Sequence, residues 1–295
     1  MILRALRLGT SRRLLVAALA AGLLAILVAA PSAFADAFTP ESGGSPNADN
    51  IDTLFKLTLY MGLVIFLIVE GTLIWSLVRY RARRGGPEAT PIRGNTPLEV
   101  GWTVGAALIL VVLTVVVFVY LDDIENPPPS GPNGLRASQA QFATVDQPEP
   151  STAGGPVLRI EVVGQQYLWR YDYGEGNGLY AYEEMVVPVD TTVVLEITGT
   201  DVIHSWWIPK LGGKADAVPG HINETWFKIP ADRAGESFTG QCAELCGANH
   251  PDMIAEVRAV TPEAFEQWTE RRRDGIRSAA EDLAEQRRQR EREDQ

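Results

Sequence analysis

The chain has 295 residues, a length that accommodates one or two domains, and a formal net charge of −11 at pH 7. We expect no nucleic-acid partner, because a net negative chain is repelled by a phosphate backbone. Apolar residues are concentrated in the first 121 positions, so the chain divides into an apolar part and a more polar part.

The N-terminus has the pattern of a secretory signal peptide. Four arginines between positions 4 and 13 precede an apolar run from Leu14 to Ala30, and the small-residue site Ala33-Phe34-Ala35 follows. We predict a signal peptide over residues 1–35, cleaved after Ala35. An uncleaved first membrane helix is the alternative, although the run is near the short end of the range that spans a bilayer. No cysteine follows the site, which excludes a lipoprotein anchor.

Two further apolar segments, about 54–80 and 102–121, each have roughly the 20 residues that a membrane helix requires. We predict a transmembrane helical hairpin over 54–121, preceded by a short extracytoplasmic segment over 36–53. The connection at about 81–98 is rich in arginine, and arginine beside a span marks the cytoplasmic side. Both ends of the mature chain are therefore expected outside the cytoplasm, in a two-span protein of a bacterial-type cell membrane.

The remaining sequence predicts an all-β domain between a linker and a helical tail. Residues 122–156 are rich in Pro, Gly and Ser, which indicates an extended linker. Over 157–262, short runs rich in Val, Ile, Tyr and Trp are separated by Gly, Pro and Asp, the pattern of a sandwich or barrel. Residues 263–295 alternate Glu, Asp and Arg, so we predict a charged, solvated helix.

A compact group of metal-ligating residues lies near the end of the β region. The segment QCAELCGANHPDM contains both cysteines of the chain and one of its three histidines. Its soft or borderline ligands, which suit copper, are Cys242, Cys246, His250 and Met253. His204, in the apolar context DVIHSWWIP, is about where a neighbouring loop could supply another ligand. Two thiolates, two imidazoles and a thioether exceed the needs of one blue-copper centre, which indicates a second metal ion.

Other uses of these residues stay open. Two cysteines in an exported protein can form a disulfide, although this gives no role to the histidines or to Met253. A Cys2His2 zinc site satisfies the ligand count but also leaves Met253 without a role. Considered alone, Met253 would be a core residue at the start of the alternating stretch 254–260.

The spacing C-x3-C-x3-H-x2-M, with His204 about forty residues before it, resembles the binuclear copper (CuA) domain of cytochrome c oxidase subunit II. The resemblance extends over DVIHSW, KADAVPG and GQCAELCGANH and over the two apolar spans. It implies a cupredoxin-like barrel at 157–262 that binds two copper ions. The implied ligands are His204, Cys242, the backbone carbonyl of Glu244, Cys246, His250 and Met253. The Glu244 side chain matches a family residue that binds Mg or Mn at the boundary with subunit I; an exposed loop acid is the alternative.

The resemblance also implies roles for residues around the copper centre. In GQQYLWRYDYG, Tyr167 stands where relatives commonly have an exposed tryptophan that receives electrons, and Trp169 matches a second tryptophan of the pattern. Both residues are therefore candidates for the point at which electrons arrive, although Trp169 could be simply a buried ring. Asp172 and Asp201 are candidate acids for docking the electron donor, with a solvated face as the alternative.

Three further residues are singled out by their place in the pattern. Glu99 matches a family glutamate at the mouth of a proton channel into subunit I, but an acid at a helix start is also a favourable neighbour of the helix dipole. Glu70 lies within the first span and is expected to face subunit I, because a charge facing lipid is costly. His221 stands where the family often has arginine, and we expect a surface or interface residue.

The implied function is that of subunit II of a proton-pumping haem-copper cytochrome c oxidase. Such a subunit accepts electrons from cytochrome c or a similar donor outside the cytoplasm and passes them to haem in subunit I, but it does not reduce oxygen alone. The acidic balance of residues 122–262 favours a basic donor. The chain has no C-x-x-C-H motif, so no haem is expected in it.

The expected partners are subunit I and the other oxidase subunits, membrane lipid, and a copper chaperone or reductant that keeps the exported thiols reduced. Two alternatives come from other classes of protein. One is a membrane-tethered copper-delivery protein, which two spans and a full binuclear ligand set oppose. The other is a structural zinc domain that serves as a scaffold.

Overall fold

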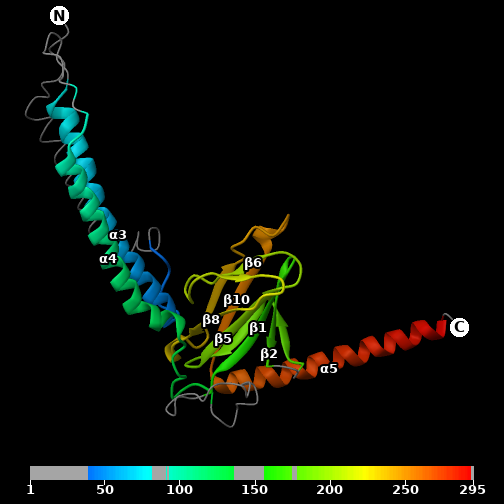
Figure 1. Cartoon of the computed structure of the whole chain (residues 1–295). Helices are drawn as coiled ribbons and strands as arrows, with labels where there is room; N and C mark the ends of the chain where they lie inside the picture. The colour runs from blue at the N-terminus through cyan, green and yellow to red at the C-terminus, as the bar shows by residue number, and fades with distance from the viewer. Residues whose placement is uncertain (1–38, 82–90, 92, 136–155, 175–177, 294–295) are drawn as a thin grey trace, which may run out of the picture. The chain divides into compact units, whose positions relative to one another are not determined.

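The computed structural model describes residues 39–81, 91, 93–135, 156–174 and 178–293 (Figure 1). The chain divides into two units at residue 40, and the elements described below belong to the second. The predicted signal peptide, most of the arginine-rich connection and the greater part of the predicted linker lie outside the described residues.

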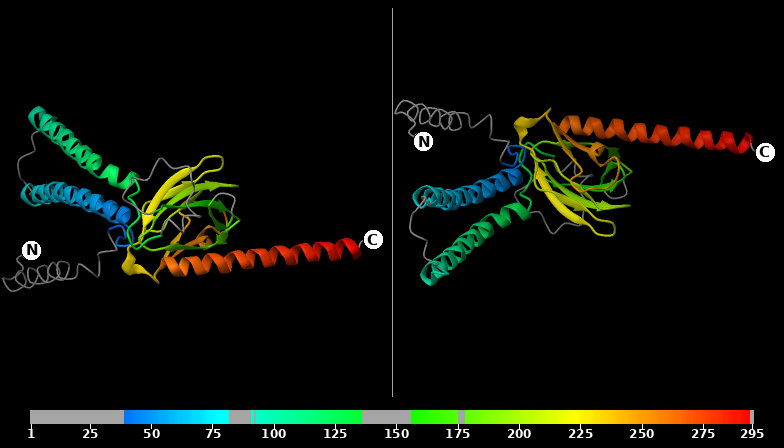
Figure 2. Two further views of the ribbon diagram at one scale, coloured as in Figure 1. Left: turned by 90° about the horizontal axis from the view of Figure 1, so that it is seen from below. Right: turned by 90° about the horizontal axis from the view of Figure 1, so that it is seen from above.

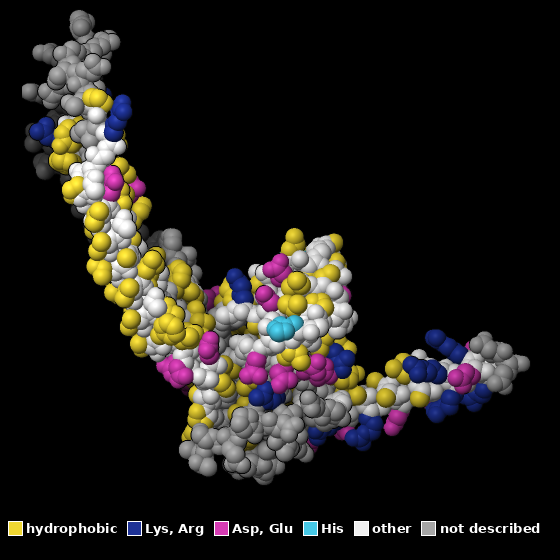
Figure 3. Space-filling view, viewed as in Figure 1, with side chains coloured by type: hydrophobic (Ala, Val, Ile, Leu, Met, Phe, Trp, Pro, Cys, Tyr) yellow, Lys and Arg dark blue, Asp and Glu magenta, His cyan; other side chains and the backbone are white. Residues whose placement is uncertain are grey.

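Two long helices, α3 (Pro46–Arg79) and α4 (Thr96–Glu125), form the predicted hairpin. Both are long and apolar enough to cross a membrane. Each has proline in its first turn, where the missing N–H costs nothing, and this explains why the helices begin before the predicted apolar segments. Apolar side chains cover the described surface of the pair (Figure 3), as expected for surfaces that lipid or a partner covers.

Ten strands follow in the described part of the chain, and most of them form two sheets. The larger sheet has the order β3-β2-β1-β5-β8, with β1 (Leu158–Gln165), β2 (Leu168–Tyr173), β3 (Tyr180–Tyr182), β5 (Thr192–Gly199) and β8 (Asn223–Lys228). The smaller has the order β4-β10-β9, with β4 (Glu184–Pro188), β9 (Ser237–Gln241) and β10 (Ile254–Val260). Strands β6 (His204–Trp206) and β7 (Ala215–Ala217) form a separate ribbon.

Both sheets mix parallel and antiparallel pairs. Strand β1 runs antiparallel to β2 and parallel to β5, and β10 runs parallel to β4 and antiparallel to β9. Along β1 every second residue is buried, so one face of the larger sheet forms the core. The Tyr173 hydroxyl links the sheets, because it donates to the Val186 carbonyl at 3.0 Å and accepts from the Val186 N–H at 2.8 Å. The all-β domain of the predicted fold class is confirmed.

The outer ends of the two membrane-length helices contact strand β8. The Asn47 amide donates to the Trp226 carbonyl at 3.1 Å, and the Trp226 indole donates to the Ile124 carbonyl at 2.8 Å. The Ser45 hydroxyl accepts from the Lys228 N–H at 3.1 Å. Side-chain hydrogen bonds therefore join β8 to the start of α3 and to the end of α4.

The first part of the predicted linker is packed against the β domain. Ser130 is buried; its hydroxyl donates to the Pro156 carbonyl at 2.7 Å and accepts from the Thr192 N–H at 2.9 Å. Leu135 is also buried, and its N–H donates to the Thr191 hydroxyl at 3.0 Å. Residues 128–135 thus differ from the expected extended linker, because the Thr191 and Thr192 hydroxyls at the start of β5 bind the backbone of Leu135 and Pro128.

Helix α5 (Pro262–Glu293) corresponds to the predicted charged tail (Figure 2). Its first turns pack on the core, where the rings of Phe265 and Trp268 lie 6.2 and 5.1 Å from the ring of Tyr173. Arg272 donates to the Tyr180 carbonyl at 2.8 Å. All described residues after Ile276 are exposed, so the second half of the helix is solvated as predicted.

Candidate metal centre

The predicted metal ligands come from two neighbouring segments of the β domain. His204 opens β6, whereas both cysteines, His250 and Met253 lie on the connection between β9 and β10. The connection is closed on itself by the Cys242 N–H, which donates to the Met253 carbonyl at 2.9 Å. It is tied to β6 by the Ala243 N–H, which donates to the Ser205 carbonyl at 2.8 Å. The two segments are therefore held together by backbone hydrogen bonds.

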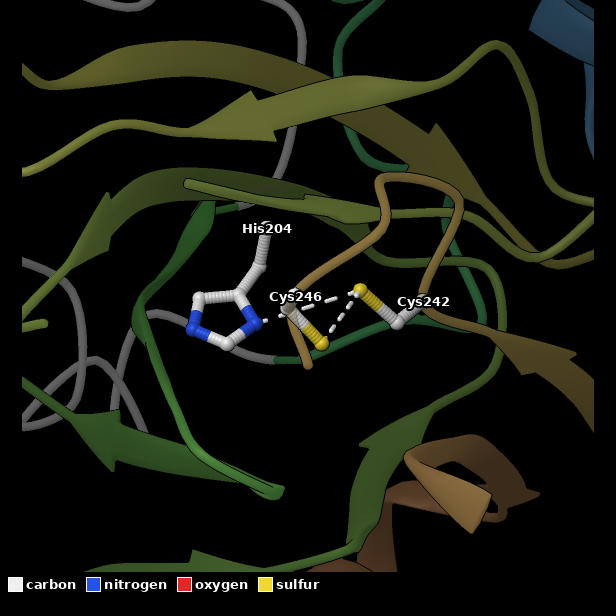
Figure 4. A group of neighbouring side chains, drawn as sticks. All are labelled: His204, Cys242 and Cys246. Atoms are coloured by element: carbon white, nitrogen blue, oxygen red, sulfur yellow. Dashed lines mark hydrogen bonds between the residues drawn. The ribbon is translucent and has the colours of Figure 1, made fainter. Parts of the chain in front are cut away.

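The predicted donor atoms converge around the two thiols, and Figure 4 shows the His204 ring beside Cys242 and Cys246. Cys242 Sγ lies 3.9 Å from His204 Nδ1 and 3.2 Å from the Glu244 carbonyl oxygen. Cys246 Sγ lies 3.5 Å from His250 Nδ1 and 3.9 Å from Met253 Sδ. The two sulfur atoms are 3.9 Å apart. Each thiol thus has its own imidazole and a further donor, and the two groups meet at the sulfur pair.

The chemistry of this donor set fits a soft metal ion. The cysteines are free, and their sulfur separation is far longer than the roughly 2.0 Å of a disulfide. Cys242, Cys246 and His204 are 2 %, 4 % and 0 % exposed, so the donors lie out of contact with bulk water. Thiolates, imidazoles and a thioether suit copper or zinc and not the hard cations calcium and magnesium.

Protons compete with a metal for this site. Burial, with the neighbouring Cys242, raises the pKa of the Cys246 thiol to about 11. The thiol is therefore protonated near neutral pH in the metal-free chain. A thiol must lose its proton to bind a metal. Only an ion with a strong preference for thiolate can therefore displace the proton at this site.

The orientation of His204 is fixed by Asp201. His204 Nε2 lies 2.8 Å from Asp201 Oδ1, which leaves Nδ1 directed at the cysteine pair. Desolvation opposes ionisation of this carboxylate, but hydrogen bonds from the Gln166 N–H and from His204 outweigh it and lower the pKa of Asp201 below its usual range. Metal-binding histidines commonly donate their second N–H to a carboxylate in this way. This role differs from the two predicted for Asp201, donor docking or a solvated face, and its spacing of three residues from His204 is the feature of the sequence that indicates it.

Asp201→Asn is expected to lower copper affinity by about 10- to 100-fold, the usual cost of losing such a partner of a metal-binding histidine. Competition titration against a copper chelator measures the effect. Asp172→Asn is the matched control, because Asp172 binds Arg170 at 2.7 Å on strand β2 instead of His204. Equal copper affinity of the two variants would show that the contact of Asp201 with His204 does not support copper binding.

The two aromatic candidates lie in different environments. Trp169 is fully buried, with its ring 5.9 Å from the ring of His204. Gly164 makes room for this pair, since an added Cβ would lie 3.0 Å from Trp169 and 3.1 Å from His204. Tyr167 is partly exposed in the turn between β1 and β2, and its hydroxyl accepts from the Ala248 N–H at 3.1 Å. Only Tyr167 of the two therefore contributes to the surface.

Three of the other predicted residues, Glu99, Glu70 and His221, are outside the donor cluster. Glu99 is in the first turn of α4, and its side chain accepts from the Asn95 N–H at 3.1 Å. This contact supports the helix start, one of the two roles expected for it. Glu70 lies within α3, and His221 is exposed in a turn where its N–H donates to the Val218 carbonyl at 3.1 Å. The Glu244 side chain is exposed beside the centre.

Two membrane-length helices followed by a β domain that gathers thiols, imidazoles and a thioether define a membrane-anchored protein with a cupredoxin-like domain and a candidate metal centre. Family models described as "Cytochrome C oxidase subunit II, transmembrane domain" and "Cytochrome C oxidase subunit II, periplasmic domain" match residues 34–119 and 177–260. Cytochrome c oxidase subunit 2 of Thermostichus vulcanus is 34 % identical over 253 residues, which cover 76 % of this chain and 75 % of the relative. Cytochrome c oxidase subunit 2 of Cereibacter sphaeroides is 32 % identical over 280 residues, which cover 87 % of this chain and 90 % of the relative.

The chain belongs to the cytochrome c oxidase subunit II family. It is a membrane protein with a periplasmic domain, and its homologues are part of an oxidoreductase complex. The crystal structure of the periplasmic domain of subunit II from Bradyrhizobium japonicum is similar at 36 % identity and a TM-score of 0.38, covering 40 % of this chain and 95 % of that one.

Proposed function

We propose that this chain is the electron-accepting subunit of a proton-pumping haem-copper cytochrome c oxidase in a bacterial plasma membrane. It takes electrons from a cytochrome c outside the cytoplasm and delivers them to haem in subunit I, where oxygen is reduced to water. The observation that carries the proposal is the convergence of two thiols, two imidazole nitrogens, a thioether and a carbonyl in one cluster, of which both thiols, the thioether and His204 are buried. A single-copper centre uses fewer donors.

Two copper ions would be held by His204, Cys242, the Glu244 carbonyl, Cys246, His250 and Met253. A copper pair held by these residues would share one electron over both ions and would change little in structure on reduction. The chain contributes a preformed cluster with buried thiols, in which Asp201 orients His204. Because both cysteines are free, loading requires a reductant or copper chaperone that prevents disulfide formation.

The residues around the centre are proposed to interact with the electron donor and with subunit I. Tyr167 is the proposed point at which electrons arrive, because it is partly exposed and hydrogen-bonded to the metal-binding loop. Asp172 and Asp201 dock a basic donor. The exposed Glu244 carboxylate binds Mg or Mn at the boundary with subunit I, and Glu99 collects protons for subunit I at the cytoplasmic side.

The test is metal counting and electron paramagnetic resonance on the full-length chain, reduced, loaded with copper and purified in detergent. Two coppers per chain, with one unpaired electron coupled equally to both nuclei, are expected. One copper with an isolated-ion spectrum would support the copper-delivery alternative. Preference for zinc, retained in Met253→Leu, would support the zinc scaffold, because a Cys2His2 zinc site does not use the thioether.

A further inference from the structure

The turn between β1 and β2 holds the metal-binding loop at two points. The Gln166 side-chain amide donates to the Cys246 carbonyl at 2.6 Å, and the Tyr167 hydroxyl accepts from the Ala248 N–H at 3.1 Å. Neither side chain belongs to the proposed ligand set. We infer that Gln166 and Tyr167 form a clamp on the backbone of residues 246–248 and are positioning residues for the metal centre.

The clamped segment carries two proposed ligands at its borders. Gly247, Ala248 and Asn249 are exposed and lie between Cys246 and His250, outside the strands. Exposed segments with few apolar contacts open at low free-energy cost. Within the loop, the His250 N–H donates to the Gly247 carbonyl at 3.2 Å. Holding residues 246–248 therefore also sets the 3.5 Å separation of Cys246 Sγ and His250 Nδ1.

The shape of the loop supports the clamp independently of the hydrogen bonds. Gly247 has a φ of +135°, and an added Cβ would lie 2.5 Å from the Tyr167 hydroxyl and 2.9 Å from the Gln166 amide nitrogen. Both clamp groups thus converge on one residue that has no side chain. Glycine is required there both for its backbone conformation and for the space that the clamp occupies.

The clamp depends on the residue type at position 167. The Ala248 N–H needs an acceptor, which a tyrosine hydroxyl provides. An indole N–H only donates, and phenylalanine has no polar group, so Tyr167→Phe and Tyr167→Trp both keep an aromatic ring and remove the acceptor. Gln166→Met removes the other contact while keeping a side chain of similar length.

The first experiment uses the metal-free, full-length chain in detergent and does not depend on the proposed function. Amide hydrogen exchange at Ala248 is expected to be roughly five- to ten-fold faster in Tyr167→Phe than in the native chain, the consequence of losing one hydrogen bond. Gln166→Met tests the second contact through exchange over residues 246–250. Tyr182→Phe is the matched control, since it removes the hydroxyl of an exposed tyrosine on β3.

The second experiment rests on the proposed function and uses the copper-loaded chain. Tyr167→Phe is expected to shift the visible absorption of the centre and to release copper to a chelator roughly five-fold faster than Tyr182→Phe. A purely structural hydroxyl would lower the unfolding midpoint without changing the spectrum. The inference is overturned if exchange at Ala248 matches the control, or if exchange changes while spectrum and release do not. Failure of the native chain to bind a copper pair would overturn the proposed function. The hydrogen-exchange result on the metal-free chain would then decide by itself whether the clamp exists.

Discussion

Replacing Cys246 by serine is expected to reduce the copper content of the chain from two ions to at most one and to lower electron acceptance to background. Cys246 Sγ lies within 3.9 Å of Cys242 Sγ, His250 Nδ1 and Met253 Sδ, so the substitution removes the donor that joins both halves of the cluster. A hydroxyl is a hard donor that keeps its proton at neutral pH and does not replace a thiolate at copper. The metal-free chain should lose about 1 kcal/mol of stability, since a more polar group is buried.

The measurement compares Cys246→Ser with Ala248→Ser in the assembled oxidase. Ala248 is exposed in the same loop, so its variant introduces the same hydroxymethyl group without removing a proposed ligand. Copper is counted per chain, and oxidation of reduced cytochrome c is followed. Two coppers and full activity in Cys246→Ser would remove this residue from the ligand set. Loss in both variants would point to damage of the loop instead of loss of a ligand.

The donor cluster could be predicted from the sequence because most of its members are neighbours in the chain. Cys242, Cys246, His250 and Met253 lie within one short connection, and a loop of that length brings its own residues together in almost any fold. His204 is 38 positions before Cys242 in the chain, so its approach depends on how β6 lies against that loop. The resemblance to a known spacing supplied this information, and composition alone did not.

The contacts that position the cluster were not predictable in the same way. Asp201 looked like one of several surface acids, and only the turn before β6 brings its carboxylate within 2.8 Å of His204. The role of the Tyr167 hydroxyl likewise depends on the register of two segments that are 81 positions apart in sequence. Residues 128–135 have the Pro and Gly content of a linker, yet their backbone is bound by the hydroxyls of Thr191 and Thr192 at the start of β5. Such pairings leave no periodic trace in the sequence.

Because of similar long-range packing, Gly240 is the backbone position where a substitution is expected to have the largest effect on stability and copper binding. Gly240 lies on β9, just before Cys242, and faces the residues that follow β6. A Cβ built at Gly240 would overlap the Trp207 carbonyl oxygen and lie 2.8 Å from two atoms of Ile208. The neighbouring Gln241 N–H donates to that same carbonyl at 3.0 Å. The absence of a side chain therefore lets the His204 segment and the cysteine segment meet.

Gly240→Ala is expected to cost about 3 kcal/mol of stability, the upper range for overpacking, because backbone and not a flexible side chain is in the way. It should also lower copper binding, since separation of the two segments moves His204 away from Cys242. Urea unfolding of the metal-free chain and copper counting on the loaded chain measure the two effects. Gly213→Ala is the control, where an added Cβ makes only an ordinary contact of 3.6 Å with Ile51. If both variants unfold at the same urea concentration and bind equal copper, the close approach at Gly240 is not what holds the donor cluster together.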